Sequence, residues 1–552
     1  MTNYTPPEYR PPVVGAPVVT DTPYPQPAPQ QNPYLMPQAP EKPKREYSLR
    51  ENIFAWLSFI LAYFFWLAVP INDNPLGAFI VVLLMYIGAT IVLLVKGKKP
   101  QFMPVLVGVS AVVVSTCLIL TSSSFMHFFA FMYAMVAYCY YLYGLSGNQR
   151  FRFSDFILVD FVKALFVLPF YSFSDMFVSM FSGKGNKGGR FIVKILCGIL
   201  IAVVPTLIVL SLLSYDSDFS NLMDKMFNFK NFDLMSHIVK LFLALPFGAY
   251  AYSIYISSVD KKCENILTAE SCKKSMNSVR FAPAITLLTA SLPVLFLYVV
   301  FFISQWKYYV SGFTGVLPKE FSYAQYAREG FFQLCTVSVI NLIILIVIAL
   351  FLKRKENKPS ILLKVLSVVF SVFTLVLIST AVAKMVMYIN CYGLTPKRVY
   401  SSWFMLVLAL VFILIIVKQF VKKIKLIALS LSILVLMFAG LSLSGVEEFI
   451  AEYNVNRYLE GSLSTVDIEA LDELGDPAIE HLVRLANILD ERNGTDIAIE
   501  KVSYTDESMY SRLVVLLRDE AVKLKAQDNS VWSFTVPSLK AEKALRSTAL
   551  FD

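Results

Sequence analysis

The chain has 552 residues, of which 56% are hydrophobic and only 16% are charged, and its mean hydropathy is +0.60. Soluble domains usually carry about a quarter charged residues, so this composition excludes three or four ordinary soluble domains in series. The composition predicts an integral membrane protein of the all-α class, built as a polytopic bundle of transmembrane helices.

The N-terminal tail differs from the rest of the chain. Its first 46 residues hold 13 of the 27 prolines and show almost no apolar periodicity. Such a segment buries too little apolar surface to offset its ordering entropy. We therefore expect residues 1–50 to form a disordered, proline-rich tail. It lacks the apolar region of a signal peptide.

Eleven apolar runs of about 17 to 25 residues, the length that spans a bilayer, follow this tail. The expected spans are 53–71, 76–95, 104–120, 125–144, 191–213, 238–258, 282–303, 332–352, 361–383, 402–418 and 426–444. Residues 51–144 form two helical hairpins, because the connections at 72–75 and 121–124 are short. Residues 191–444 form a seven-span domain.

Residues 153–181 allow two interpretations. They are apolar enough for a span, but three aspartates and a lysine interrupt them. We prefer an amphipathic helix in the cytoplasmic interface, with Phe161, Leu165 and Leu168 facing the lipid. With the basic, glycine-rich hinge that follows, it makes up the region 145–190, which contacts anionic lipid. If the segment spans instead, every later side assignment reverses.

The distribution of Lys and Arg predicts the orientation. If alternate connections lie in the cytoplasm, starting with the N-terminal tail, that side holds 26 Lys and Arg near the spans and the opposite side holds 8. The N-terminus is therefore expected in the cytoplasm. The odd number of spans places the C-terminus outside the cytoplasmic membrane.

Residues 445–552 predict a small, mostly helical extracytoplasmic domain. They hold 11 Lys and Arg against 21 Asp and Glu, a net charge of −10, whereas residues 1–444 hold 38 against 19, a net charge of +19. Asp476-Pro477 is typical of a helix start. Apolar residues recur at helical spacing in two segments: Ile479, Leu482, Ala486 and Leu489, then Leu513, Leu517, Ala521 and Leu524.

Motifs of common enzyme classes are absent from the sequence. There is no His-Glu-x-x-His pair, no Cys-x-x-Cys, no nucleotide fingerprint and no Gly-x-Ser-x-Gly elbow. We therefore expect no enzyme activity, no metal, no cofactor and no nucleic-acid partner. Ionisable residues inside the expected spans are few, which argues against an ion-coupled transporter.

Polar residues gather instead in the connections expected on the outer side. The candidate binding residues there are Gln305, Tyr308, Tyr326, Arg328, Glu329, Lys384 and Arg398. One interpretation is an aromatic belt with interfacial cations, which tryptophans at the expected helix ends support. The other is a pocket in which cations and tyrosines surround an anionic ligand or lipid head group.

Three ordered stretches carry a resemblance to a known family. They are Phe321–Leu334, Tyr392–Arg398, and Tyr453–Arg457 leading to Leu471–Ile479. Over roughly residues 190–490 the chain resembles the bacterial membrane family known as domain of unknown function 4153/4173. The resemblance implies a polytopic bacterial protein with an aromatic-Ala-Arg-Gly-Phe motif between two spans. It brings no catalytic residues.

The family positions matched here are Tyr326, Arg328, Gly330, Phe331, Gly393, Leu394, Thr395 and Arg398. The chain departs from the family at Gly475-Asp476-Pro477, where we expect Asp-Ala before the proline. These residues either bind a ligand or hold the helix bundle together.

With no catalytic motif and possible binding surfaces at both ends, we expect a sensory, regulatory or scaffolding component of the cell envelope. Its partners would be the lipid bilayer, anionic lipid at the cytoplasmic face, and an envelope protein or ligand at the outer face. The alternative is a transporter or flippase for an amphipathic envelope intermediate. A third possibility is a membrane enzyme acting on lipid-linked substrates, with Asp216, Asp218 or Glu329 as acid or base.

Overall fold

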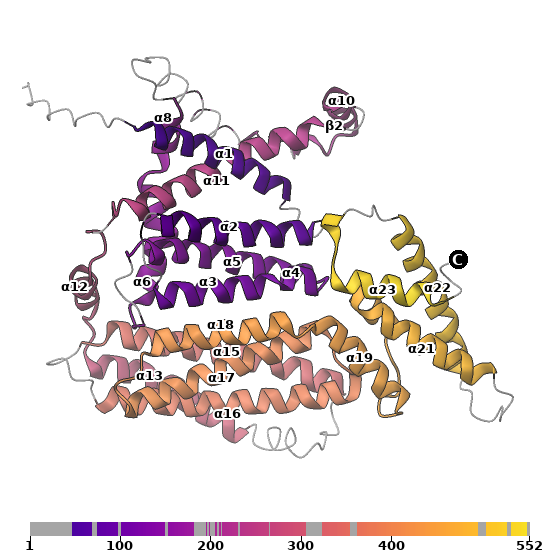
Figure 1. Ribbon diagram of the computed structural model, residues 1–552. Helices are drawn as coiled ribbons and strands as arrows, with labels where there is room; N and C mark the ends of the chain where they lie inside the picture. The colour runs from indigo at the N-terminus through magenta and orange to yellow at the C-terminus, as the bar shows by residue number, and fades with distance from the viewer. Residues whose placement is uncertain are drawn as a thin grey trace, which may run out of the picture. The chain divides into compact units, whose positions relative to one another are not determined.

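The computed structural model describes residues 47–68, 74–95, 101–148, 153–181, most of 212–304, 323–353, 361–494, 504–526 and 531–548, with scattered residues between 195 and 210. Helices make up nearly all of this part (Figure 1). Its strands are one antiparallel pair of two residues each, β1 (Asn228–Phe229) and β2 (Phe232–Asp233). The predicted all-helical class is therefore confirmed. The proline-rich tail lies outside the described residues.

The first half of the bundle, residues 49–279, consists of helices joined by short polar connections. These are α1 (Leu49–Ala68), α2 (Pro75–Val95), α3 (Phe102–Ser115), α4 (Cys117–Leu120), α5 (Ser124–Leu145), α10 (Ser217–Phe227), α11 (Leu234–Val259) and the short α12 (Ala269–Val279). Pro75 is the first residue of α2, a position at which a backbone N–H has no acceptor within the helix, so its absence costs nothing. The Ser123 side chain caps α5 by accepting from the Met126 N–H.

The second half contains α13 (Ala284–Ser304), α15 (Tyr323–Phe351), α16 (Ile361–Tyr392), α17 (Pro396–Phe420) and α18 (Leu426–Leu443). Its core includes Phe331, Phe370 and Phe412, each almost fully buried. The outward-facing side chains of these helices are largely apolar, as expected for surfaces that face lipid rather than water.

Ten of the described helical segments are long and apolar enough to cross a membrane. Nine coincide with expected spans, within a few residues except at the ends of α16 and α17, and the tenth is 157–181. The expected span 53–71 is the 20-residue helix α1, which is not among these ten. The expected span 191–213 lies mostly outside the described residues. The chain is thus a multi-pass membrane protein.

Segment 157–181 is a broken helix rather than a continuous one. It consists of α6 (Ile157–Val162), a π-helical turn η1 (Lys163–Val167), α7 (Leu168–Tyr171) and α8 (Phe173–Phe181). The prediction that Leu168 faces the lipid is wrong, because its side chain is only 1% exposed and packs in the core of the first half. Its partners there come from α5 and α11 as well as from its own segment.

Both ends of this broken helix lie at the same end of the bundle. Tyr143 in the last turn of α5 donates to Asp160 (3.2 Å). Further along, Lys262, just after α11, pairs with Asp175 (3.4 Å), and Ser179 donates to Asn52 in the first turn of α1 (3.1 Å). We call this the loop end; it is formed by the start of α1 and the ends of α5 and α11. Residues near both ends of the broken helix therefore contact the loop end.

The opposite end of the bundle, which we call the domain end, comprises the end of α1 and the starts of α2, α11 and α17. Helices α1 and α11 are antiparallel, since Phe54 contacts Tyr255 with ring centroids 4.4 Å apart and Tyr63 bonds His237 at 2.8 Å.

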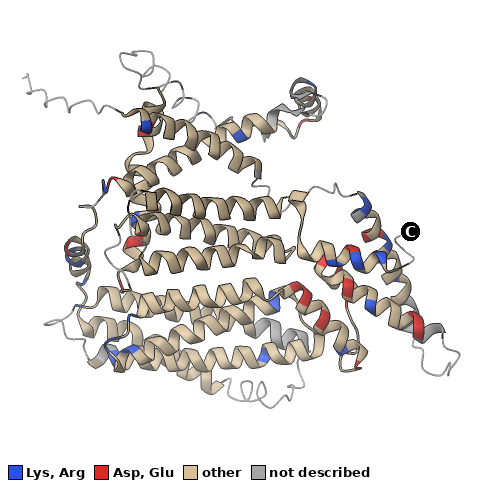
Figure 2. Cartoon of the chain, in the orientation of Figure 1, with Lys and Arg blue, Asp and Glu red and all other residues tan. Residues whose placement is uncertain are grey.

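The C-terminal domain consists of helices α19 (Val446–Leu459), α20 (Ile468–Asp472), α21 (Asp476–Gly494), α22 (Tyr504–Ala526) and α23 (Val536–Arg546), with a 3₁₀ turn η2 (Val531–Ser533). The predicted apolar positions are buried in one core: Ile479, Leu482, Ala486, Leu489, Leu513, Leu517 and Ala521. Acidic side chains collect on these helices, whereas the spans show few charges (Figure 2). The domain sits at the domain end (Figure 1).

Candidate functional site

The predicted outer cluster can be traced only in part. Gln305 and Tyr308 lie outside the described residues. Tyr326, Arg328 and Glu329 occupy the first turns of α15, and their side chains lie outside the described part of the structure. The family motif expected in a connection thus continues into the helix that forms the next span.

Lys384 lies in a helix and not in a connection as predicted. Helix α16 runs to Tyr392, so Lys384 precedes its end by eight residues, about 12 Å of helix. Its side chain is fully buried, beside Ala381 and Met385 in the core of the second half. The apolar run ended at Lys384 in the sequence, and that is why the span was predicted too short.

Arg398 closes the turn between α16 and α17. Its guanidinium stacks on the Tyr388 ring, 4.0 Å from the centroid, and Nη1 donates to the carbonyl oxygens of Tyr392 (3.0 Å) and Gly393. The last carbonyls of a helix lack partners within it and carry its partial negative charge. Arg398 therefore has a structural role, as a cationic cap on α16.

The third family stretch, Tyr453–Arg457, binds the second, Tyr392–Arg398, directly. The Asn454 side chain on α19 accepts from the Leu394 N–H (2.7 Å) and donates to the Leu394 carbonyl (2.9 Å). Gly393 is required next to this pair, because its φ is +73° and a Cβ there would lie 3.0 Å from Asn454 Cγ. Asn454 thus extends the backbone hydrogen bonding of the turn as a second strand would.

Arg457 adds a contact from the third stretch to the last turn of α16. It donates to the Ile389 carbonyl of α16 (3.3 Å), and its guanidinium lies 5.6 Å from the Tyr453 ring centroid. We call the set Tyr388, Gly393, Leu394, Arg398, Asn454 and Arg457 the motif joint. It fixes the first helix of the C-terminal domain onto the turn between two membrane spans.

A buried carboxylate, Glu447, forms the second connection between the domain and the bundle. It is only 4% exposed and accepts hydrogen bonds from the hydroxyls of Tyr400 on α17 (2.8 Å) and Thr121 after α4 (2.7 Å). The Thr121 carbonyl in turn bonds His127 Nε2 (2.8 Å). No local pattern predicts this cluster, because it joins residues 326 positions apart through a single glutamate at a helix start.

A small polar cavity lies at the loop end. Its volume is about 110 Å³, and its lining residues are Tyr143, Gly147, Asn148, Lys163, Leu168, Ser257 and Cys263. The buried Ser257 hydroxyl has no partner among the described atoms. The ends of α5 and α11 meet here, because Asn148 donates a hydrogen bond to the Ser258 carbonyl (2.6 Å). The C-terminal end of each helix carries a partial negative charge, which the Lys163 ammonium offsets. Ordered water suits such a cavity.

A larger groove runs along α22 on the C-terminal domain. It encloses about 730 Å³ and is lined by Asp472, Ser511, Arg512, Val515, Leu516, Asp519, Glu520, Val522 and Lys523. Burial and the neighbouring Glu520 raise the pKa of Asp472. Among the described residues no three His, Cys, Asp or Glu side chains are placed to hold a metal ion.

Comparison with known proteins gives a family and no named relative. No curated protein and no solved structure matches the chain. The model of the family described as "Domain of unknown function (DUF4153)" matches residues 108–485, more than half of the chain. The match extends further toward the N-terminus than the expected residues 190–490, so it includes α5, the broken helix and Thr121. Because this match covers more than half of the chain, the chain belongs to the DUF4153 family.

Proposed function

We propose that the protein is a sensory, regulatory or scaffolding component of the bacterial cell envelope, in which the C-terminal domain and the membrane bundle move as one unit. The observation that carries this proposal is the Glu447 cluster. One carboxylate on the domain binds Thr121 from the first half of the bundle and Tyr400 from the second half. A displacement of α19 must therefore shift both halves or break both bonds.

The energies of these contacts are sufficient for such coupling. A hydrogen bond to a charged group contributes about 1.5–3 kcal/mol, and leaving a buried polar group unpaired costs a similar amount. Coupling free energies of about 1–3 kcal/mol are typical of proteins in which one site changes another. The Glu447 cluster and the motif joint each supply an amount in this range.

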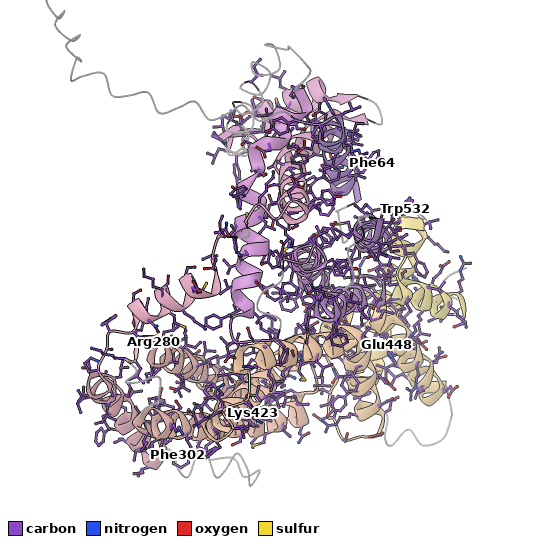
Figure 3. The ribbon with its side chains drawn as sticks, turned by 60° about the vertical axis from the view of Figure 1, so that its left-hand side comes forward. Phe64, Arg280, Phe302, Lys423, Glu448 and Trp532 are labelled. Atoms are coloured by element: carbon purple, nitrogen blue, oxygen red, sulfur yellow. The ribbon has the colours of Figure 1, made fainter. Side chains whose placement is uncertain are left out.

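The proposed role can be tested by complementation with a matched pair of variants. Glu447→Ala removes the buried carboxylate, whereas Glu448→Ala removes its exposed neighbour, which pairs with Lys540 at 2.5 Å (Figure 3). In a deletion strain whose envelope-stress phenotype has been defined, we expect Glu448→Ala to restore the wild-type phenotype and Glu447→Ala to fail at equal protein level. Equal restoration by both variants would contradict the coupling.

The orientation with the N-terminus in the cytoplasm and the C-terminus outside is part of the proposal. The excess of basic residues in the connections predicted to be cytoplasmic supports it. Lys423 is exposed in the connection between α17 and α18 at the loop end, where it can contact anionic lipid.

A membrane-impermeant maleimide tests this orientation in intact cells. Cys263 is buried, so Cys272 on α12 is the reporter for the loop end and Cys391 on α16 is the reporter for the domain end. We expect Cys391 to react in intact cells and Cys272 to react only after lysis. The reverse pattern would place the C-terminal domain in the cytoplasm.

Transport or lipid flipping is the second candidate function, and one observation favours it. Lys384 is buried deep in a span, and ionisable residues in spans often mark a substrate path. Reconstituted vesicles with a fluorescent phospholipid would show flipping that Lys384→Met abolishes; inert wild-type vesicles would argue against this function. The enzyme hypothesis gains no such support: Asp216 is exposed and caps α10 by accepting from the Phe219 N–H (2.9 Å).

A further inference from the structure

The C-terminal domain carries one exposed apolar segment. Residues 529–539 form the longest run without a charged residue in this acidic domain. Within it Val531 is 73% exposed, Trp532 54% and Phe534 38%. Three large apolar side chains in four residues are an exposed patch of the kind that marks a binding surface.

The patch lies beside the start of a membrane span. A Cβ on Gly77 would be 3.6 Å from Trp532 Cε3, so the indole ring packs directly over Gly77. Gly77 is the third residue of α2, about 3 Å along the helix from its first residue. Figure 3 shows Trp532 next to the helices of the first half. The ring is therefore at the level where the hydrocarbon of a bilayer meets the head groups.

Two other tryptophans lie toward the domain end of the bundle. Trp66 is in the last turn of α1, and Trp403 lies near the start of α17, where its Nε1 donates to the Met437 carbonyl (3.1 Å). Tryptophan is enriched at membrane interfaces because its ring is apolar and its N–H is polar. Trp66 Nε1 is buried and Trp403 Nε1 is held by the bundle, whereas Trp532 is 54% exposed and so open to an interface of this kind.

We propose that residues 531–534 form a lipid contact, inserting Val531, Trp532 and Phe534 into the boundary between head groups and acyl chains. The occupant is phospholipid of the leaflet on the C-terminal domain's side. The position of Trp532 on α2 favours lipid, because a bilayer around α2 must reach the patch. This contact would anchor the domain at a point remote from the motif joint, and it holds whichever function the protein has.

Fluorescence quenching in full-length protein tests the contact. The emission of Trp532 is obtained as the difference between wild type and Trp532→Phe, both reconstituted in phosphatidylcholine bilayers. The lipids carry bromine either near the head group or near the methyl end of the chains, and acrylamide serves as the aqueous quencher. We expect shallow bromine to remove roughly half of the Trp532 emission and deep bromine to remove less.

Two results would overturn the proposal. Quenching by acrylamide but not by either brominated lipid would place Trp532 in water, and resistance to all three quenchers would place it against another protein surface, such as a second copy. A variant pair supplies an independent check. Val531→Asp should weaken lipid quenching of Trp532, whereas Val515→Asp, at an equally apolar exposed position on α22, should not.

Discussion

Replacing Gly393 by alanine should loosen the motif joint in two ways. At φ of +73° an alanine adopts a left-handed conformation that costs about 1–2 kcal/mol. The new Cβ would also collide with the Asn454 side chain, forcing it out of position. Asn454 then loses both hydrogen bonds to Leu394 in a buried site, which costs about 2–4 kcal/mol. We expect a total loss of about 3–6 kcal/mol.

The same reasoning makes a sharper statement about the double variant. Asn454→Ala alone loses only the hydrogen bonds, about 2–4 kcal/mol. Once Asn454 is shortened, the alanine at position 393 has nothing left to displace, so the double variant should be no less stable than Gly393→Ala alone. Simple additivity would instead predict a loss of about 5–10 kcal/mol.

Unfolding of the full chain in mixed micelles, titrated with SDS and followed by tryptophan fluorescence, measures these differences. Gly440→Ala in α18 is the control, because no atom lies within 4 Å of its Cβ position and no positive φ is involved. It should be neutral or slightly stabilising. Additive losses in the double variant would refute the proposed contact between Gly393 and Asn454.

Three further predictions follow from buried polar groups of the domain. Glu447→Ala should cost about 3–5 kcal/mol in the same titration, because the buried Thr121 and Tyr400 hydroxyls lose the acceptor of their protons, whereas Glu447→Gln should cost about 1 kcal/mol. Equal losses would mean that the charge matters and not the hydrogen bonds. Burial lowers the pKa of His481 below 6.5, so the unfolded state binds more protons than the folded state. The free energy of unfolding should therefore fall as the pH drops from 6.5 through the folded pKa. His481→Leu should flatten this pH dependence, and an unchanged pH dependence would contradict the role of His481. Burial and Glu520 raise the pKa of Asp476, so the folded state binds more protons than the unfolded state. Stability should therefore rise as the pH falls through this raised pKa toward 3.8. Melting curves of Asp476→Asn should lack this rise.

The sequence alone located the membrane helices well, because a bilayer demands about 20 apolar residues in a row whatever the tertiary structure. The same criterion failed at α16, where Lys384 ended the apolar run although the helix continues to Tyr392. A charged residue that other helices bury leaves no local signal of that burial. The length criterion also could not decide whether residues 157–181 span the bilayer or lie in its interface, since both kinds of helix are equally apolar.

For the candidate site, residue types alone suggested a ligand pocket, and that pocket stays a prediction; of its described members, Lys384 is buried and Arg398 caps a helix. Arg398 was a reasonable candidate, because arginine often binds anions, but it caps α16 and stacks on Tyr388. Family motifs pointed to the right stretches without showing that they contact each other. Asn454 and Leu394 are sixty positions apart, and only the tertiary structure joins them.

Length, composition and periodicity determined that this chain is a multi-pass helical membrane protein with an acidic helical domain at its C-terminus. Those properties depend on each segment's own apolar surface and net charge, which the sequence states directly. The tertiary structure decided where Glu447, Thr121 and Tyr400 meet, and that Trp532 reaches the start of α2. These are contacts between segments distant in sequence, and their geometry depends on how whole helices pack rather than on any local pattern.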